Sequence, residues 1–288
     1  MLGQRILTAI VLLIVLGLAL AAPGHWPLPL LLVLAAACAL WEWLRMVWPG
    51  SAAGKVGPLL LAAAGGAAML WLLGGLLAPD DAFPGRYAAH TLMSWAVLLA
   101  GLFWLLGATT LVVRGQTASA PGSLALAAVG IVAVLATWWT LTRFYLDHGA
   151  WFLVSLMALV WVADIGAYFA GKTWGRRKLA PKVSPGKSVE GAVGGIVAAL
   201  LWVGLSGQWP GSFGQALVRE YAWPLAALIV AGLAAISIVG DLFESLLKRR
   251  AGMKDSSRLL PGHGGVYDRI DALLPVSVLA WLLLKGLA

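Results

Sequence analysis

Long apolar runs separated by shorter polar segments set the pattern of this 288-residue chain. A helix needs about 20 mostly apolar residues to cross the hydrocarbon layer of a membrane, because each residue rises about 1.5 Å. Nine such runs, of which the seventh and ninth are short, lie at residues 6–22, 27–48, 56–78, 92–113, 124–142, 149–170, 189–206, 222–246 and 271–288. The pattern predicts an all-α, polytopic integral membrane protein with about nine transmembrane helices.

The composition strengthens this prediction. Hydrophobic residues make up 61% of the chain and charged residues only 11%, whereas a soluble domain carries about 25% charged residues. A soluble chain of this length could not bury so much apolar surface, so most of it must face lipid. The single cysteine, Cys38, excludes an intramolecular disulfide, and the sequence offers no Cys/His cluster for zinc.

The first apolar run has two interpretations. Arg5, the apolar residues 6–22 and the triplet Ala19-Leu20-Ala21 resemble a signal peptide with its cleavage site. The same residues fit an uncleaved first transmembrane helix, which is the interpretation we favour. Cleavage would leave the topology of the remaining chain unchanged.

The net charge of +8 is gathered in particular loops, and this predicts the orientation of the chain. Loops on the cytoplasmic side of a membrane protein carry an excess of lysine and arginine. With the N-terminus in the cytoplasm, only four of the 20 basic residues fall on the opposite side: Arg86, Arg143, Arg219 and Lys285. We therefore expect a multi-pass protein of the inner membrane, with the polar loops 171–188 and 247–270 in the cytoplasm.

Residues 164–191 form the first of two polar stretches. Asp164 and Tyr168 are four residues apart and share one face of the sixth predicted helix. Glycines and six basic residues, ending at Lys187, then precede the seventh helix, a combination that suits a polyphosphate. A basic loop that contacts anionic lipid headgroups would give the same composition.

The second polar stretch runs from residue 240 to 271. Asp241, Ser245 and Lys248 form one helical stripe, with Glu244 beside it. Carboxylates close to basic residues suit Mg²⁺, which takes one or two carboxylates together with substrate phosphate oxygens.

A salt bridge to Lys248 or an arginine would explain Asp241 by itself. It would not explain Asp255 and the pair Asp268 and Asp271, which are three residues apart and can project together.

Two polar residues have open roles. His263, between two glycines, could act as a general acid or base, donate a hydrogen bond to phosphate, or serve only the structure of its loop. Glu42, within the second predicted helix, either reaches the site or pairs with Arg45, three residues further on.

Between Ser245 and Asp271 the sequence carries, in order, Leu247-Lys248-Arg249, Lys254-Asp255, Ser257, Leu260-Pro261, His263-Gly264-Gly265-Val266 and Asp268-Arg269-Ile270-Asp271. This run resembles the signature of phosphatidate cytidylyltransferases, also called CDP-diacylglycerol synthases. The upstream stretch with Asp164, Ser184-Pro185 and Lys187-Ser188 is similar to a second polar block of that family. The resemblance implies an all-helical membrane fold, often dimeric, with a two-metal centre near the cytoplasmic boundary.

The resemblance also implies the reaction, in which a cytidylyl group moves from CTP to phosphatidic acid and leaves CDP-diacylglycerol and pyrophosphate. It assigns metal binding to Asp241 and Asp268, and we expect Mg²⁺ and a second metal ion there, with Asp271 and Glu244 as further ligands. Lys248 and His263 complete the catalytic set. The expected substrate-binding residues are Asp164, Tyr168, Lys172, Ser184, Lys187, Ser188, Glu190, Ser245, Arg249, Lys254 and Arg269.

This interpretation divides the chain into N-terminal transmembrane helices, residues 1–148, and a C-terminal catalytic membrane region, residues 149–288. The expected partners are CTP, phosphatidic acid, the lipid bilayer and a second copy of the chain, and not nucleic acid. One alternative is transfer to another lipid phosphate or to a lipid alcohol. Another is a carrier of anionic lipid, although a carrier should spread its charges along a path and show interrupted helices in two matching halves.

The charge distribution yields a test of topology. Reporter fusions after Lys182 and after Ser257 should both report the cytoplasm, because both positions follow clusters of basic residues. A fusion near Gly211 should report the opposite side. If the first two fusions reported different sides, the two polar loops could not contribute to one site.

Overall fold

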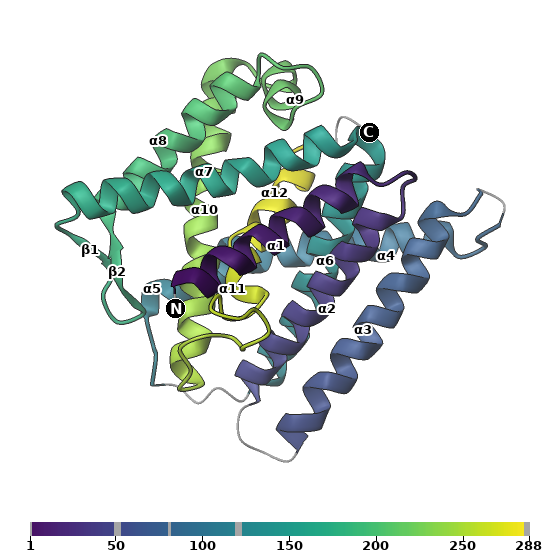
Figure 1. Ribbon diagram of the computed structural model, residues 1–288, viewed down its shortest axis with the longest axis horizontal. Helices are drawn as coiled ribbons and strands as arrows, with labels where there is room; N and C mark the ends of the chain where they lie inside the picture. The colour runs from purple at the N-terminus through teal and green to yellow at the C-terminus, as the bar shows by residue number, and fades with distance from the viewer. Residues whose placement is uncertain (1, 49–52, 80–81, 119–122, 285–288) are drawn as a thin grey trace. The chain divides into compact units, whose positions relative to one another are not determined.

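The computed structural model describes residues 2–48, 53–79, 82–118 and 123–284 (Figure 1). The chain forms two compact units, each assembled from separate stretches of sequence. Unit 1 comprises Met1–Ala100, Ala118–Thr142 and Leu247–Ile270. Unit 2 comprises Gly101–Thr117, Arg143–Leu246 and Asp271–Ala288.

Unit 1 is helical, and α2 contacts α1, α3 and α11 within it. It contains α1 (Leu2–Ala21), α2 (Pro27–Val47), α3 (Ala53–Leu77), most of α4 (Arg86–Leu102), most of α6 (Leu124–His148) and the short α11 (Tyr267–Ile270). Helices α2 and α3 run side by side (Figure 1). The buried Trp43 of α2 donates from its indole nitrogen to the carbonyl of Leu126 in α6 at 2.9 Å. Gly130 leaves room for that ring.

Unit 2 is built on a close pair of helices. It contains η1 (Phe103–Ala108), α5 (Thr109–Arg114), α7 (Ala150–Trp174), β1 (Lys178–Ala180), β2 (Ser184–Ser188), α8 (Val189–Ser206), α9 (Phe213–Glu220), most of α10 (Trp223–Arg250) and α12 (Leu273–Leu284). Helices α7 and α8 lie side by side, with the strand pair at one shared end (Figure 1). A Cβ on Gly195 would lie 2.8 Å from the carbonyl oxygen of Ala163, so small residues let these helices approach closely.

The structure confirms the all-α, polytopic class, because the described residues of all nine predicted runs are mostly helical. Seven helices among the described residues are long and apolar enough to cross a membrane: Pro27–Val47, Val56–Leu77, Arg86–Arg114, Leu124–His148, Ala150–Trp174, Val189–Ser206 and Trp223–Arg250. The first and ninth runs correspond to the shorter apolar helices Ile6–Ala21 and Leu273–Leu284. The end of the ninth run, residues 285–288, lies outside the described residues.

The polar loops contain more regular structure than the sequence pattern predicted. Residues 171–188 hold the end of α7 and an antiparallel hairpin in which Ala180 pairs with Ser184. Helix α10 continues to Arg250, and the segment 207–221 contains α9. Short hydrogen-bonded elements of this kind lack the long hydropathy signal of a membrane span. The division at residue 148 into a transmembrane and a catalytic region stays a prediction.

The signature loop, residues 251–266, joins α10 to α11. Glu42 holds this loop against α2. The Glu42 side chain is fully buried. It accepts hydrogen bonds from the hydroxyls of Ser256 at 3.0 Å and Ser257 at 2.5 Å. It also accepts from the backbone N–H groups of Val266 at 3.0 Å and Tyr267 at 2.6 Å. Four donors thus satisfy a carboxylate that would otherwise be costly to bury.

This network selects one of the two roles that the sequence left open for Glu42, since the carboxylate reaches the loop that carries the polar signature. Arg45 instead lies over the Trp41 ring, with its guanidinium carbon 4.8 Å from the ring centroid. The first helix also contacts the loop, because the Thr8 hydroxyl donates to the Pro261 carbonyl at 2.8 Å.

Glu42→Gln tests the network. The amide keeps the size of the side chain but replaces one acceptor oxygen with a donor, so buried donors of the loop lose their partner. Each such loss costs about 1–3 kcal/mol, and the variant should unfold at a lower temperature and be cut faster by trypsin after Lys254 and Arg258. The matched control is Glu220→Gln on the exposed end of α9. Equal stability of the two variants would contradict the anchoring role.

Candidate active site

Asp268 organises the signature loop in unit 1. Its Oδ2 atom accepts from the N–H of Ser256 at 2.9 Å, the hydroxyl of Ser256 at 2.8 Å and the N–H of Gly265 at 2.8 Å. Its Oδ1 atom binds Nζ of Lys248 at 2.6 Å. One oxygen therefore holds the loop, and the other holds a cation from α10.

The paired glycines of the motif have a steric explanation. Gly264 has φ of +85°, which disfavours other residues, and a Cβ there would lie 2.7 Å from Oδ2 of Asp268. A Cβ on Gly265 would lie 2.5 Å from Oε1 of Glu42. The backbone can approach both carboxylates only because these two positions lack side chains.

His263 and Arg269 stabilise the same turn. The N–H of His263 donates to the Leu260 carbonyl at 2.9 Å, and the His263 carbonyl accepts from Nε and Nη2 of Arg269 at 3.1 and 2.7 Å. These contacts give the backbone of His263 and the side chain of Arg269 structural roles. An acid–base role for the imidazole, and substrate contacts of Arg269, stay predictions.

Unit 2 contains a second acidic cluster, centred on Asp241 of α10. Oδ2 of Asp241 binds Nζ of Lys187 at 2.6 Å, and its Oδ1 accepts from the Ser245 hydroxyl at 3.5 Å. Asp164 of α7 lies within electrostatic range of both Lys187 and Asp241. The side chains of Lys187 and Asp241 are 26% and 32% exposed, so this cluster is open to a ligand.

Asp271 and Glu244 lie deeper in the same unit. Oδ1 of Asp271 accepts from the N–H of Ala272 at 2.7 Å, and its side chain is hydrogen-bonded to Glu244. Burial, and secondly the charge of Asp241, raise the pKa of Asp271 above its usual range. Asp271 and Glu244 therefore form a buried acidic pair within electrostatic range of Asp241.

Several predicted substrate-binding residues shape the hairpin of unit 2. The Ser188 hydroxyl caps α8 by accepting from the N–H of Gly191 at 3.1 Å. Glu190 accepts from the N–H groups of Arg176 and Arg177 at 3.0 and 3.2 Å, and from Nε of Arg177 at 3.1 Å. These contacts fix the base of the hairpin, where Lys187 directly precedes Ser188 at the end of β2.

The predicted site residues are shared between the two units. Unit 1 holds Lys248, Arg249, Lys254, His263, Asp268 and Arg269. Unit 2 holds Asp164, Tyr168, Lys172, Ser184, Lys187, Ser188, Glu190, Asp241, Glu244, Ser245 and Asp271. Within unit 2, Lys172 also lies over the Tyr168 ring, with Nζ 5.7 Å from its centroid. A common metal site of Asp241 and Asp268 stays a prediction.

The described residues contain no group of three or more His, Cys, Asp or Glu side chains arranged to hold a metal. The donor chemistry nevertheless fits a hard cation. Asp241 and Asp268 each offer carboxylate oxygens, and each already holds a lysine ammonium group at 2.6 Å. Mg²⁺ commonly takes one or two carboxylates and obtains its other ligands from water and phosphate oxygens, so a complete protein cage is not required.

Glu42 is one of the two residues, with His263, whose roles the sequence left open. Its signal is an acidic side chain inside an apolar span, a placement that is costly and generally functional. The partner of that carboxylate could not be inferred, because Ser256 lies 214 residues further along the chain.

Comparison with known proteins gives one consistent family. The family described as "Cytidylyltransferase family" matches residues 3–287. The phosphatidate cytidylyltransferase of Pseudomonas aeruginosa is 38% identical over 98% of this chain and 97% of its own length. The enzyme of that name from Bacillus subtilis is 34% identical over 98% and 97%. That of Haemophilus influenzae is 48% identical over 44% of this chain and 43% of its own. The chain belongs to the cytidylyltransferase family.

Proposed function

We propose that this protein is a phosphatidate cytidylyltransferase, which converts CTP and phosphatidic acid into CDP-diacylglycerol and pyrophosphate for phospholipid biosynthesis. The observation that carries the proposal is the signature loop folded around Asp268, with Lys248 bound to the same carboxylate. Two relatives with that name match over nearly the whole chain, which supports the same conclusion.

In the reaction, an oxygen of the phosphatidate phosphate attacks the α-phosphorus of CTP. The new P–O bond forms as the bond from the α-phosphorus to the bridging oxygen breaks, and the electron pair leaves with pyrophosphate. The nucleophile arrives ionised, so no general base is required. Because two anions must meet, the protein has mainly to neutralise and align them.

The lysines perform the neutralisation in this proposal. Lys187 and Lys248 are each oriented by a carboxylate at 2.6 Å, and an ammonium group is a cation that can bind phosphate oxygens. Asp241 and Asp268 would hold Mg²⁺, and Mg²⁺ bound there would stabilise negative charge on the α-phosphate and on the leaving group. The mutual hydrogen bond and burial of Asp271 and Glu244 favour a supporting position behind Asp241.

The proposal also includes the side of the membrane on which the active site lies, a second metal ion and a homodimer. The excess of basic residues in loops 171–188 and 247–270 supports a cytoplasmic active site on the inner membrane. A second metal ion and a homodimer are further parts of the proposal, which follow from the family resemblance.

Pyrophosphate release tests the function directly. Purified protein in detergent should release pyrophosphate from CTP when phosphatidic acid and Mg²⁺ are present, and not when the lipid is omitted. Release with a lipid alcohol or another lipid phosphate, but not with phosphatidic acid, would indicate the alternative acceptor. Absence of release with all of these lipids would contradict the assignment to a transferase.

The matched variant for this assay is Asp241→Asn, which keeps the shape of a partly exposed side chain. It should lose nearly all turnover without loss of folding, and EDTA should stop the wild type until Mg²⁺ is restored. Asp268→Asn should also lose turnover, but it should unfold at a lower temperature because Asp268 holds the signature loop. Full activity of Asp241→Asn would remove this residue from the metal site.

Lys187→Ala tests the role of the hairpin. If Lys187 binds a CTP phosphate in the ground state, the KM for CTP should rise more than kcat falls. Loss of one charge-assisted contact, about 1.5–3 kcal/mol, corresponds to a roughly ten- to hundred-fold lower kcat/KM. The control Lys187→Arg keeps the charge and should retain most of the affinity. An unchanged KM for CTP would mean that Lys187 only faces lipid headgroups, and a rise confined to phosphatidic acid would move the hairpin to the lipid entrance.

A further inference from the structure

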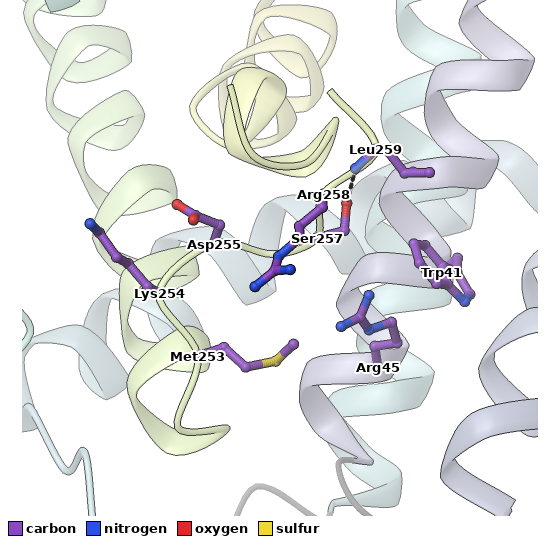
Figure 2. Close-up of a pocket in the computed structure, with 8 residues that line it drawn as sticks. All are labelled: Trp41, Arg45, Met253, Lys254, Asp255, Ser257, Arg258 and Leu259. Atoms are coloured by element: carbon purple, nitrogen blue, oxygen red, sulfur yellow. Dashed lines mark hydrogen bonds between the residues drawn. The ribbon is translucent and has the colours of Figure 1, made fainter. Parts of the chain in front are cut away.

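Unit 1 contains a cavity of about 590 Å³ beside the signature loop (Figure 2). One wall is the last turns of α2, with Trp41 and Arg45, and the other wall is the segment from Met253 to Leu259. None of the contacts described for Asp268 or Asp241 involves Trp41, Arg45 or Arg258. Among the residues predicted to bind substrate, Lys254 lines this cavity.

The cavity is strongly basic. Arg45, Lys254 and Arg258 line it, and Asp255 is the acidic residue among the lining side chains. The guanidinium groups of Arg45 and Arg258 point into the same space between α2 and the loop (Figure 2). Two like charges that face one space repel each other, and an anion between them removes that cost. The planar guanidinium group is suited to bidentate contacts with phosphate.

The cavity is also preorganised. The guanidinium of Arg45 rests on the Trp41 ring at 4.8 Å, which limits its freedom. The opposite wall is fixed by Ser257, whose hydroxyl donates to Glu42 at 2.5 Å and accepts from the N–H of Leu259 at 3.1 Å. Glu42 lies three residues before Arg45 on α2, so one buried carboxylate holds the loop against the helix that carries the first arginine.

Two observations favour a lipid phosphate over a water-soluble one. Arg45 lies in the last turn of α2, a helix long and apolar enough to span the membrane, and lipid headgroups are found at the end of such a helix. Trp41, Met253 and Leu259 add apolar surface beside the cations. A phosphate monoester carries nearly two negative charges at neutral pH, and the three cations and one carboxylate of the cavity leave two positive charges.

We infer that this cavity binds the phosphate monoester headgroup of the lipid substrate, with Arg45 and Arg258 contacting the phosphate and Trp41 orienting Arg45. The inference rests on the proposed function, which supplies phosphatidic acid as the lipid. It assigns substrate recognition to α2, in the N-terminal part of the chain, where no polar motif was found.

Kinetics with purified protein in mixed micelles test the inference. Arg45→Gln and Arg258→Gln should each raise the KM for dioctanoyl phosphatidic acid by about tenfold or more, because each removes a charge-assisted contact. The KM for CTP should stay unchanged. The matched control is Arg114→Gln, which removes an exposed arginine at the end of α5 and should leave both KM values unchanged.

A binding measurement separates the inference from the proposed function. Dioctanoyl phosphatidic acid should raise the Tm of the wild type more than dioctanoyl phosphatidylglycerol does, since the diester carries only one negative charge. The larger increase in Tm with phosphatidic acid should disappear in Arg45→Gln and Arg258→Gln and persist in Arg114→Gln. This result can be obtained even if no pyrophosphate is released, in which case the proposed function fails and the binding site stands.

Two outcomes overturn the inference. Unchanged KM and Tm responses to phosphatidic acid in both variants would show that the cavity does not bind the lipid. A rise in the KM for CTP alone would assign the cavity to the nucleotide. Arg258 is exposed on the loop, and exposed substitutions usually change stability by no more than about 0.5 kcal/mol, so its variant keeps the test decisive if Arg45→Gln misfolds.

Discussion

The burial of the Glu42 carboxylate is the constraint on which the signature loop depends. Four donors from the loop and the start of α11 converge on it, and two of them are backbone N–H groups. Asp268 repeats the arrangement, with two backbone N–H groups and a serine hydroxyl on one oxygen. The loop is thus folded around two carboxylates, and the one hydroxyl hydrogen of Ser256 is shared between them. Removal of either acceptor would leave buried donors unsatisfied, so the polar loop keeps one conformation on an apolar helical protein.

The pairing of a carboxylate with a lysine occurs in both units. Asp268 orients Lys248 in unit 1, and Asp241 orients Lys187 in unit 2, each at 2.6 Å. A carboxylate that holds an ammonium group is also a ligand for a hard cation, and the lysine that it orients can bind phosphate. Charge arranged in this way suits the proposed reaction between two anions. The basic cavity beside α2 uses the same kind of arrangement for the lipid phosphate. There the Glu42 carboxylate holds the loop that carries Arg258 against the helix that carries Arg45.

Much of the fold and part of the candidate site could be predicted from local sequence. Each transmembrane helix reflects a sum of transfer free energies over about 20 consecutive residues, and such a sum can be calculated without knowledge of any partner. The spaced motif from Ser245 to Asp271 was specific enough to indicate the family, which the match over residues 3–287 confirmed. Its glycines are required by backbone geometry and by close approach to carboxylates, constraints that leave a visible mark in sequence.

By itself, then, the sequence determined the membrane class, the approximate helix positions, the family and the acidic and basic residues of the motif. Only the tertiary structure decided that Glu42 accepts from a loop more than two hundred residues away, that Arg45 and Arg258 face one cavity, and that Glu190 closes a hairpin. The physical reason is the range of the interactions. Hydropathy and turn preferences act between neighbours along the chain, whereas a hydrogen bond or a shared cavity depends on which distant segments meet.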